Sequence, residues 1–100
     1  MADTPEVKVK RKVVTQLKAL GAYYFYPVTG GYGASGVPDI VGCYKGMFFA
    51  IECKAGKNKP TPLQQKNIDS IAAQGGAVQV VNEDNMNEVT TWLSSITQAR

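Results

Sequence analysis

The sequence of 100 residues contains no histidine. Histidine is the usual general base at neutral pH and the partner of the nucleophile in serine and cysteine hydrolases. Its absence excludes those hydrolases, and it also excludes nucleases that bind their metal through histidine. Any catalysis by this chain must therefore depend on carboxylates, lysine and a metal ion.

Cysteine is scarce as well, since Cys43 and Cys53 are the only two. In the hairpin proposed below they point to opposite faces, so a disulfide between them is not expected. Two cysteines without histidine also leave no zinc-finger ligand set. We interpret both as small core residues of a protein in a reducing compartment, without a redox role.

Long apolar runs are also missing. No run approaches the length that crosses a bilayer, and residues 1–6 lack the basic and apolar segments of a secretion signal. With 44% apolar and 19% charged residues, the chain has material for one globular domain, 1–100, but not for two. We therefore expect a soluble, cytoplasmic protein with no membrane partner.

Neither sign of charge dominates, but the charges are unevenly placed. Eleven Lys and Arg against eight Asp and Glu give a net charge of +3. The basic residues form two clusters, one near the start and one in the middle of the chain, comprising Lys8, Lys10, Arg11 and Lys12, and Lys54, Lys57, Lys59 and Lys66. Such clusters suit a polyanion such as nucleic acid, although a solvated face explains either cluster alone equally well.

Residues 37–54 are the stretch around which the rest of the chain is organised. Two β-rich runs joined by Lys45-Gly46 predict a hairpin with a two-residue turn. Asp39 then lies directly opposite Glu52, and Lys54 shares their face because strand side chains alternate. The remaining pairs in this register are Tyr44 with Met47, Cys43 with Phe48, Gly42 with Phe49, Val41 with Ala50, and Ile40 with Ile51.

Asp39, Glu52 and Lys54 are thereby predicted to converge at the open end of the hairpin. Like charges about 5 Å apart destabilise a strand pair, and a divalent cation with oxygen ligands is the simplest compensation. The alternative is two solvated carboxylates with Lys54 as an ordinary ion-pair partner. Both faces of the hairpin carry apolar residues, and this favours the cation because unpaired charges inside a covered sheet are costly.

The first segment of the chain predicts a helix that ends at Gly21. Thr4 provides a cap, Pro5 stands in the first turn, and Glu6 lies on the apolar stripe. Glu6 either complements the helix dipole or points toward the open end of the hairpin as a third carboxylate. The stripe contains Val9, Val13, Leu17 and Leu20. On the opposite side, where they would meet water or phosphate, are Lys8, Arg11 and Lys12.

Residues 22–26 predict a first strand that Pro27 closes, and a glycine-rich loop follows over 29–36. This loop contains G-Y-G-A-S-G, which has the spacing of a dinucleotide-binding motif. That motif requires a helix to begin at its last glycines, whereas Val37-Pro38-Asp39 begins a strand. We therefore expect no nucleotide cofactor. The loop could bring backbone amides near a phosphate, hinge over a substrate, or simply connect two strands.

The second half of the chain predicts a helix, a strand and a further helix. After the basic connection 55–60, Thr61-Pro62 begins a helix that runs to about Gln74. Its inward stripe includes Gln64, which either caps backbone groups or makes a polar contact to the site. The apolar members of that stripe are Ile68, Ile71 and Ala72. A strand over 77–81 and a helix over 85–96 complete the order, with inward residues Val89, Leu93 and Ile96.

Taken together, these segments resemble the PD-(D/E)xK nuclease superfamily. The resemblance rests on Glu6, G-V-P-D over 36–39, E-C-K over 52–54 and T-P-L-Q over 61–64. Within the superfamily the chain is most similar to the virus-type replication-repair nuclease (VRR-NUC) domain. The resemblance implies an α/β, restriction-endonuclease-like core of order α-β-β-β-α-β-α, in which helices flank a mixed central sheet.

The resemblance also implies roles for individual residues. Asp39, Glu52 and the backbone carbonyl of Cys53 would ligate Mg2+ or Mn2+, and Glu6 would complete the metal site. Lys54 would be the catalytic lysine, and Gln64 would support it from the second helix. The DNA-binding residues that we predict are Lys8, Arg11, Lys12, Lys57, Lys59 and Lys66.

These residues predict a metal-dependent DNA endonuclease that hydrolyses phosphodiester bonds. By resemblance, it would be a homodimer selective for branched or Holliday-junction DNA, acting in replication, recombination or repair in the cytoplasm of a bacterial or phage-infected cell. The alternative is a DNA-binding module that keeps the nuclease fold without catalysis. A module of that kind would not need the two acids and the lysine together.

Overall fold

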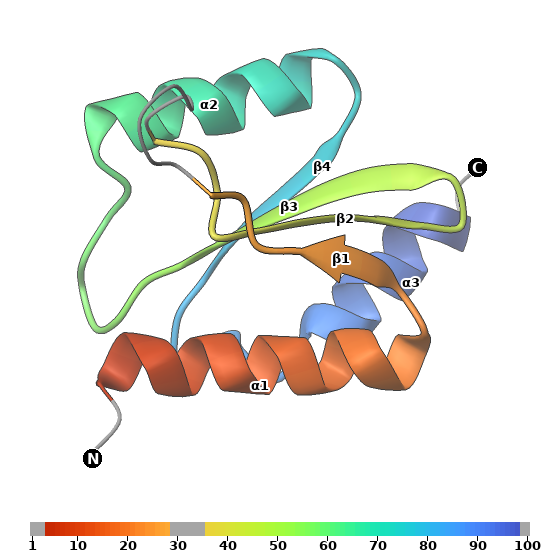
Figure 1. Ribbon diagram of the computed structural model, residues 1–100, viewed down its shortest axis with the longest axis horizontal. Helices are drawn as coiled ribbons and strands as arrows, with labels where there is room; N and C mark the ends of the chain where they lie inside the picture. The colour runs from red at the N-terminus through yellow and green to blue at the C-terminus, as the bar shows by residue number, and fades with distance from the viewer. Residues whose placement is uncertain (1–3, 29–35, 99–100) are drawn as a thin grey trace.

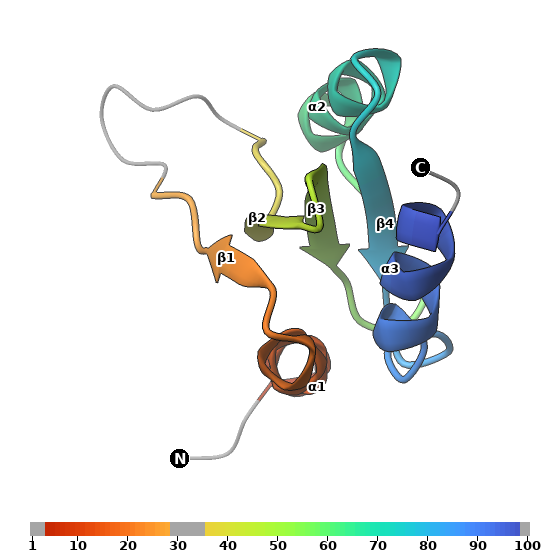
Figure 2. The ribbon, with the colours of Figure 1, turned by 90° about the vertical axis from the view of Figure 1, so that its right-hand side faces the viewer.

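The computed structural model describes residues 4–28 and 36–98. Within these ranges the elements in chain order are α1 (Pro5–Leu20), β1 (Tyr23–Phe25), β2 (Ile40–Tyr44), β3 (Met47–Cys53), α2 (Pro62–Ala73), β4 (Ala77–Val81) and α3 (Val89–Gln98). The sheet lies between α2 on one face and α1 with α3 on the other (Figures 1 and 2). This layered arrangement confirms the predicted fold class and its order of elements.

The sheet has the strand order β1-β2-β3-β4, so the predicted hairpin occupies its middle. β1 pairs antiparallel with β2, and β2 pairs antiparallel with β3, whereas β4 pairs parallel with β3. A parallel pair requires a crossover connection, and α2 supplies it. β2 and β3 thus have a strand on each side within the mixed sheet.

The β2–β3 hairpin has the register that the sequence predicts. All five pairs from Ile40 with Ile51 to Tyr44 with Met47 are present. Lys45 and Gly46 have φ angles of 50° and 82°, and a turn with two positive φ angles matches the twist of the flanking strands. Glycine adopts such an angle without the steric penalty that a side chain would bring. The short turn therefore fixes which side chains share a face.

The hydrophobic core lies between the sheet and the pair of helices α1 and α3. Alternation along the hairpin sends one set of side chains toward these helices. The fully buried members are Val9, Val13, Leu17, Ile40, Phe49, Ile51, Cys53, Val81, Val89 and Leu93. Val41, Ala50 and Glu52 alternate with this set and are buried on the opposite face, toward α2. A single glutamate is thus buried among apolar side chains. Cys53 is buried as predicted, but Cys43 is exposed, so its assignment to the core is wrong.

Close packing between β1 and β2 requires glycine at position 42. A Cβ atom built on Gly42 would lie 2.1 Å from the carbonyl oxygen of Tyr23 and 2.6 Å from the ring of Phe49. Both separations are far below van der Waals contact. Gly42 therefore allows the β1 backbone to pack closely against β2, the strand that begins directly after Asp39.

The ends of α1 follow the predicted signals. The Thr4 hydroxyl accepts a hydrogen bond from the Val7 N–H at 3.2 Å, and Gly21 ends the helix in the left-handed conformation. Beyond Gly21, β1 begins at Tyr23, one residue later than predicted, and ends at Phe25. Tyr26 therefore follows the strand and is not part of it.

The predicted start of the last helix at Asn85 is wrong, because α3 begins at Val89. In the turn before α3, asparagine side chains form hydrogen bonds with backbone N–H and C=O groups. Asn85 accepts from the Asn82 N–H at 2.8 Å and donates to the Val80 carbonyl at 3.1 Å, while Asn82 accepts from the Asp84 N–H at 2.9 Å. Such bonds compete with helical ones. Of the predicted inward residues, Val89 and Leu93 are buried and Ile96 is half-buried.

α2 packs less tightly than its sequence pattern predicts. None of its residues, all of which the structure describes, is fully buried. Ile68, Ile71 and Gln64 are half-buried, but Ala72 is exposed, so its assignment to the inward stripe is wrong. The helix lies over β4 and the end of the hairpin and leaves much of that sheet face open (Figure 2). In the described part of the chain, no helix has the length and apolar character that crossing a membrane requires.

Candidate active site

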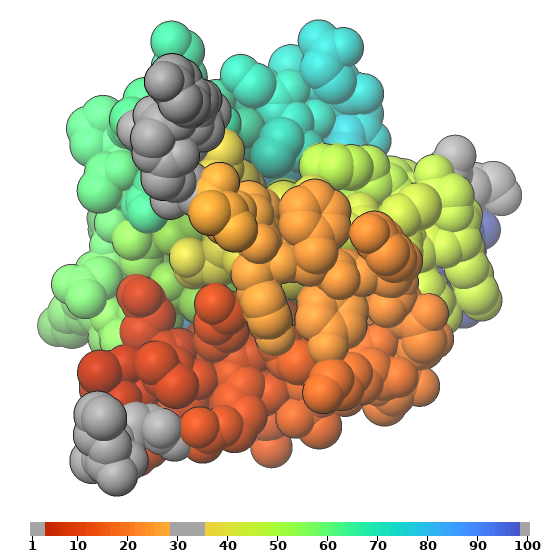
Figure 3. Space-filling view, in the orientation of Figure 1, coloured from red at the N-terminus to blue at the C-terminus, as the bar shows by residue number. Residues whose placement is uncertain are grey.

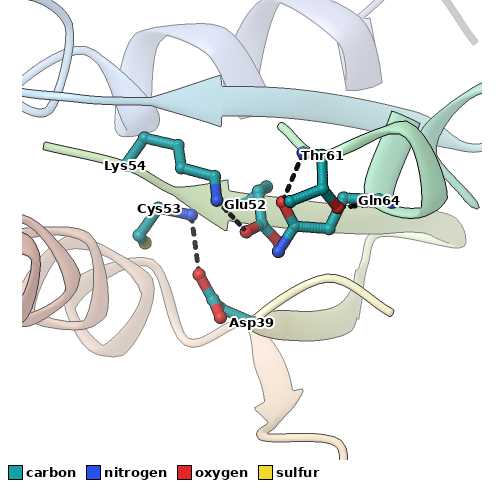
Figure 4. A network of polar contacts seen from close by, with 6 residues as sticks. All are labelled: Asp39, Glu52, Cys53, Lys54, Thr61 and Gln64. Atoms are coloured by element: carbon teal, nitrogen blue, oxygen red, sulfur yellow. Dashed lines mark hydrogen bonds and ion pairs between the residues drawn. The ribbon is translucent and has the colours of Figure 1, made fainter. Parts of the chain in front are cut away.

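Asp39 and Glu52 lie at the end of the hairpin that faces away from the turn. Asp39 directly precedes β2, and Glu52 is the second-last residue of β3, just before Cys53. The Cys53 N–H donates a hydrogen bond to Asp39 Oδ2 at 2.9 Å, which joins the two strands beyond their last regular pair (Figure 4). This bond fixes the Asp39 carboxylate next to the backbone that carries Glu52.

Glu52 is buried without full compensation of its charge. Its side chain is only 2% exposed, and one oxygen, Oε2, lies 3.6 Å from Lys54 Nζ. The other oxygen, Oε1, is buried and has no hydrogen-bond partner among the described residues. An unpaired buried carboxylate oxygen costs free energy unless a further positive group meets it. The site therefore has unused capacity to hold a cation.

Burial and the nearby Asp39 charge raise the pKa of Glu52 from 4.5 to about 7. The ammonium group of Lys54 opposes this effect and lowers the pKa. Burial and the charges of Asp39 and Glu52 also raise the pKa of the Cys53 thiol to about 12. The metal-free thiol is thus protonated at neutral pH. The Cys53 side chain is buried in the core, on the face opposite Glu52, which leaves the Cys53 backbone to border the site.

The donor set fits a hard divalent cation. Mg2+ and Mn2+ prefer carboxylate and carbonyl oxygens, and Mg2+ usually keeps several waters, so two carboxylates and a carbonyl suffice. In the ranges 4–28 and 36–98, however, no group of three or more His, Cys, Asp and Glu side chains is spaced to hold a metal ion. Asp39 and Glu52 meet as a pair, and the unpartnered Oε1 of Glu52 is the atom that a cation would satisfy.

Glu6 does not join this pair as a third side chain in a metal-binding group. It is exposed in the first turn of α1, where a negative charge complements the helix dipole. Its charge nevertheless contributes to the raised pKa of the Cys53 thiol, so Glu6 stands at the same end of the sheet. Its role as a metal ligand stays a prediction.

Gln64 uses its side chain to cap α2. Its Oε1 accepts from the Thr61 N–H at 2.9 Å, while its own N–H donates to the Thr61 hydroxyl at 3.2 Å. This reciprocal pair is a capping box, which is one of the two roles that the sequence left open. Figure 4 shows the Gln64 side chain reaching toward the side of β3 that carries Glu52. The predicted role of Gln64 in supporting Lys54 stays a prediction.

The predicted DNA-binding residues are all exposed, on three parts of the chain. α1 carries Lys8, Arg11 and Lys12, the connection from β3 to α2 carries Lys57 and Lys59, and α2 carries Lys66. Glu83 ties the connection to the turn after β4, because its carboxylate accepts from the Gly56 N–H at 2.9 Å. The glycine loop predicted near the site has residues 29–35 outside the described part of the chain.

Two residues near the site, Lys10 and Tyr26, are absent from the predicted set of site and DNA-binding residues. Lys10 Nζ lies 4.4 Å from the ring centre of Tyr26, across the junction between α1 and the segment after β1. Helical spacing places Lys10 on the flank of the buried stripe, so the sequence held a signal for its direction. Its contact with Tyr26 depends on how α1 packs beneath β1, which spacing within one element does not specify.

The raised pKa of Glu52 predicts how stability depends on pH in the metal-free protein. Between about pH 4.5 and 7 the native state keeps a proton that the unfolded state has lost, so the free energy of unfolding falls as pH rises. The expected loss is up to roughly 3 kcal/mol. Glu52→Gln should remove this dependence and be the more stable protein at pH 8, as urea unfolding at pH 5 and 8 with a chelator would measure.

The exposed Glu88→Gln is the matched control for this substitution, because it removes one carboxylate outside the pair. It should leave the slope of stability against pH as in the unmodified protein. If the slope of stability against pH were unchanged in Glu52→Gln, this would contradict the claim that burial and the Asp39 charge raise the pKa of Glu52.

Asp39 and Glu52 beside Lys54, on a mixed sheet of this order, match the arrangement of a PD-(D/E)xK nuclease that the sequence resemblance implies. The family model for the archaeal Holliday junction resolvase (Hjc) matches residues 6–84. The chain belongs to that family. The matched range contains every residue of the predicted metal and catalytic set, from Glu6 to Gln64.

Two further comparisons agree with this class. The chain is 28% identical over 85 residues to "Putative nuclease p44" of Acyrthosiphon pisum secondary endosymbiont phage 1, which covers 84% of this chain and 89% of that protein. A solved structure described as a VRR_NUC domain superposes with a TM-score of 0.72 at 22% identity, covering 92% of this chain and 97% of the other. At that identity the second comparison shows a shared fold, the one that the sequence resemblance implied.

Proposed function

We propose that this chain is a metal-dependent DNA endonuclease that hydrolyses phosphodiester bonds in branched DNA. The observation that carries the proposal is the buried Glu52 carboxylate, which faces the Asp39 charge, contacts Lys54 and leaves Oε1 without a partner. Repulsion of this kind persists in a fold when function requires it. Membership of a family of Holliday junction resolvases supports the choice of DNA as substrate.

Asp39, Glu52 and the Cys53 carbonyl would hold Mg2+ or Mn2+, and Glu6 could reach the same ion from α1. When bound, such an ion lowers the pKa of a coordinated water and neutralises charge on the phosphate. The Cys53 N–H holds Asp39 in place, so this carboxylate is oriented before the cation arrives. Burial of Glu52 excludes bulk water from one side of the site.

Lys54 would act on the phosphate itself. Its side chain is 13% exposed, and its ammonium group lies at the mouth of the site next to Glu52 Oε2. From there it can donate hydrogen bonds to a phosphate oxygen or to the attacking water and stabilise the negative charge of the transition state. Gln64 would support this end of the site from the first turn of α2.

The wider setting of the reaction is part of the same proposal. The exposed lysines and Arg11 would contact DNA phosphates, and a symmetric homodimer would present two equivalent sites to a branched DNA. Exposed aromatic side chains on the open sheet face, Tyr23, Phe25 and Phe48, offer apolar area for such a dimer. We place the activity in replication, recombination or repair in the cytoplasm of a bacterial or phage-infected cell, as befits a chain with a phage relative.

A cleavage panel tests this function. The purified protein is incubated with a four-way junction, a flap, a linear duplex and a single strand of matched sequence, each with Mg2+, Mn2+ or a chelator. Cleavage of branched DNA that requires a cation supports the proposal, and sedimentation at twice the 10.8 kDa chain mass supports the dimer. Binding of all four DNAs without cleavage in any cation would instead indicate a DNA-binding module without catalysis.

A further inference from the structure

A hollow of about 300 Å³ lies between one side of α1 and Tyr26, outside the site described above. Residues of α1 from Val7 to Lys18 line it, and Tyr26, from the segment after β1, closes it. Figure 3 shows this side of the molecule, on which orange residues of β1 and the segment that follows lie against red residues of α1. The hollow is thus formed by two elements that are separate in the sequence.

The charge of the hollow favours an anion. Its lining includes Lys10, Arg11 and Lys18 and contains no acidic residue among the described ones. Basic side chains gathered on one side of a helix create a positive potential that favours a negatively charged ligand. Phosphate groups of a nucleic acid backbone are the ligands that such a surface suits best.

The hollow also has an aromatic and apolar side, which a site for phosphate alone would not need. The Tyr26 residue is 47% exposed, Lys10 Nζ lies 4.4 Å from the centre of its ring, and the Tyr24 ring makes a T-shaped contact with it at 6.1 Å between ring centres. Val7 and Val14 supply apolar surface beside it. An exposed ring flanked by cations is the combination with which proteins bind unpaired bases, because the ring stacks on the base and the cations meet the phosphate.

Strand register places the hollow near the end of the sheet that carries the proposed active site. Phe25, the last residue of β1, pairs with Val41, two residues from Asp39, and Tyr26 directly follows Phe25. Lys10 is close enough to Cys53 for its charge to act on that residue. The hollow and Asp39 thus lie toward the same end of the sheet, with the hollow on the α1 side and Glu52 on the α2 side, and a DNA strand with a phosphate at Asp39 would reach the hollow around that end.

We infer that this hollow binds one unpaired nucleotide of the DNA strand that leads to the cleaved phosphodiester, with its base stacked on Tyr26 and its phosphate against Lys10, Arg11 and Lys18. The inference rests on the proposed function and names a feature of its substrate. A base inside an intact duplex is stacked between its neighbours and cannot reach the ring. The hollow thus selects DNA with an unpaired base beside the cut, as at a branch point or a frayed end.

Binding measurements with a chelator present test the inference without cleavage. Fluorescence anisotropy compares a short labelled oligothymidine with a duplex of the same length, for the unmodified protein, Tyr26→Leu and Tyr26→Phe. Tyr26→Leu should weaken single-strand binding roughly 5- to 150-fold, the range for losing one stacked base. Duplex binding should change less than about twofold, and Tyr26→Phe should keep the affinity because the ring remains.

Tyr44→Leu is the matched control, since Tyr44 also has a lysine near its ring, Lys45 at 5.4 Å, but lies at the turn end of the hairpin. It should bind both DNAs as the unmodified protein does. Equal loss of affinity in Tyr44→Leu, or equal loss for duplex and single strand in Tyr26→Leu, would overturn the inference.

A second measurement needs no variant. An oligonucleotide with 5-iododeoxyuridine, which cross-links on irradiation to an aromatic ring stacked on it, should attach to Tyr26, as mass spectrometry of the digested protein would show. Attachment elsewhere and not to Tyr26 would overturn the inference. Because neither experiment involves cleavage, a protein that binds in this way but never cuts DNA would contradict the proposed function and leave this site standing.

Discussion

Asp39→Asn is expected to abolish cation-dependent cleavage, with a rate at least about 10³-fold lower, because one of the two carboxylates that hold the cation loses its charge. The amide oxygen can still accept the 2.9 Å hydrogen bond from the Cys53 N–H, so the local backbone should keep its geometry. Removing this charge also relieves the repulsion that raises the pKa of Glu52. The metal-free variant should therefore be at least as stable as the unmodified protein.

Two measurements on the same samples separate chemistry from folding. Single-turnover cleavage of a labelled junction in Mg2+ gives the rate, and the shift in thermal unfolding with added Mn2+ gives cation binding. Asp39→Asn should lose both. Asp69→Asn is the control, because Asp69 is an exposed acid on α2 whose carboxylate accepts a hydrogen bond from the Gln65 side chain, and both readouts should be unchanged. Magnesium-dependent cleavage retained in Asp39→Asn or Asp39→Ala would refute the assignment.

Lys54→Met is expected to reduce cleavage about 10²- to 10³-fold while leaving cation binding nearly intact, since it removes a positive group that acts on the transition state. Methionine keeps most of the apolar length of the side chain, which is largely buried. The loss should appear in the cleavage rate and much less in DNA affinity. Single-turnover rates at saturating protein, together with Mn2+-induced stabilisation, measure the two effects separately.

The Lys54→Met variant must be measured at a pH at which Glu52 is ionised. Lys54 lowers the pKa of Glu52, which is still about 7, so the variant should have a Glu52 pKa above that of the unmodified protein. Protonated Glu52 cannot hold a cation well. Measurements at pH 8.5 and above therefore keep the carboxylate ionised in both proteins once the cation is added.

Lys57→Met is the matched control, because Lys57 is an exposed lysine in the connection just after β3. It should affect DNA affinity modestly and in a salt-dependent manner, with the rate at saturation preserved. If Lys54→Met behaved like Lys57→Met, Lys54 would be a phosphate contact and not part of the catalytic group. If Lys54→Met lost cation binding at high pH as well, its role would be to stabilise Glu52.

Local signals predicted most of the fold because they depend on neighbours in the chain. Thr4 with Pro5, Thr61 with Pro62, and the Lys45-Gly46 turn each act within a few residues, and the structure has helices and a hairpin where these signals stand. The start of α3 was predicted wrongly at Asn85. There the Asn82 and Asn85 side chains bond to backbone groups of the turn, and apolar periodicity does not report such competition.

The sequence by itself determined the hairpin register, and with it that Asp39, Glu52 and Lys54 share one end, because alternation and a two-residue turn leave one way to pair the strands. Only the tertiary structure decided how deeply Glu52 is buried, that its Oε1 has no partner among the described residues, and that Gln64 caps its own helix. It also decided that Tyr26 lies against Lys10. Burial and contacts between distant elements depend on how helices pack on the sheet, and no periodicity within one element contains that information.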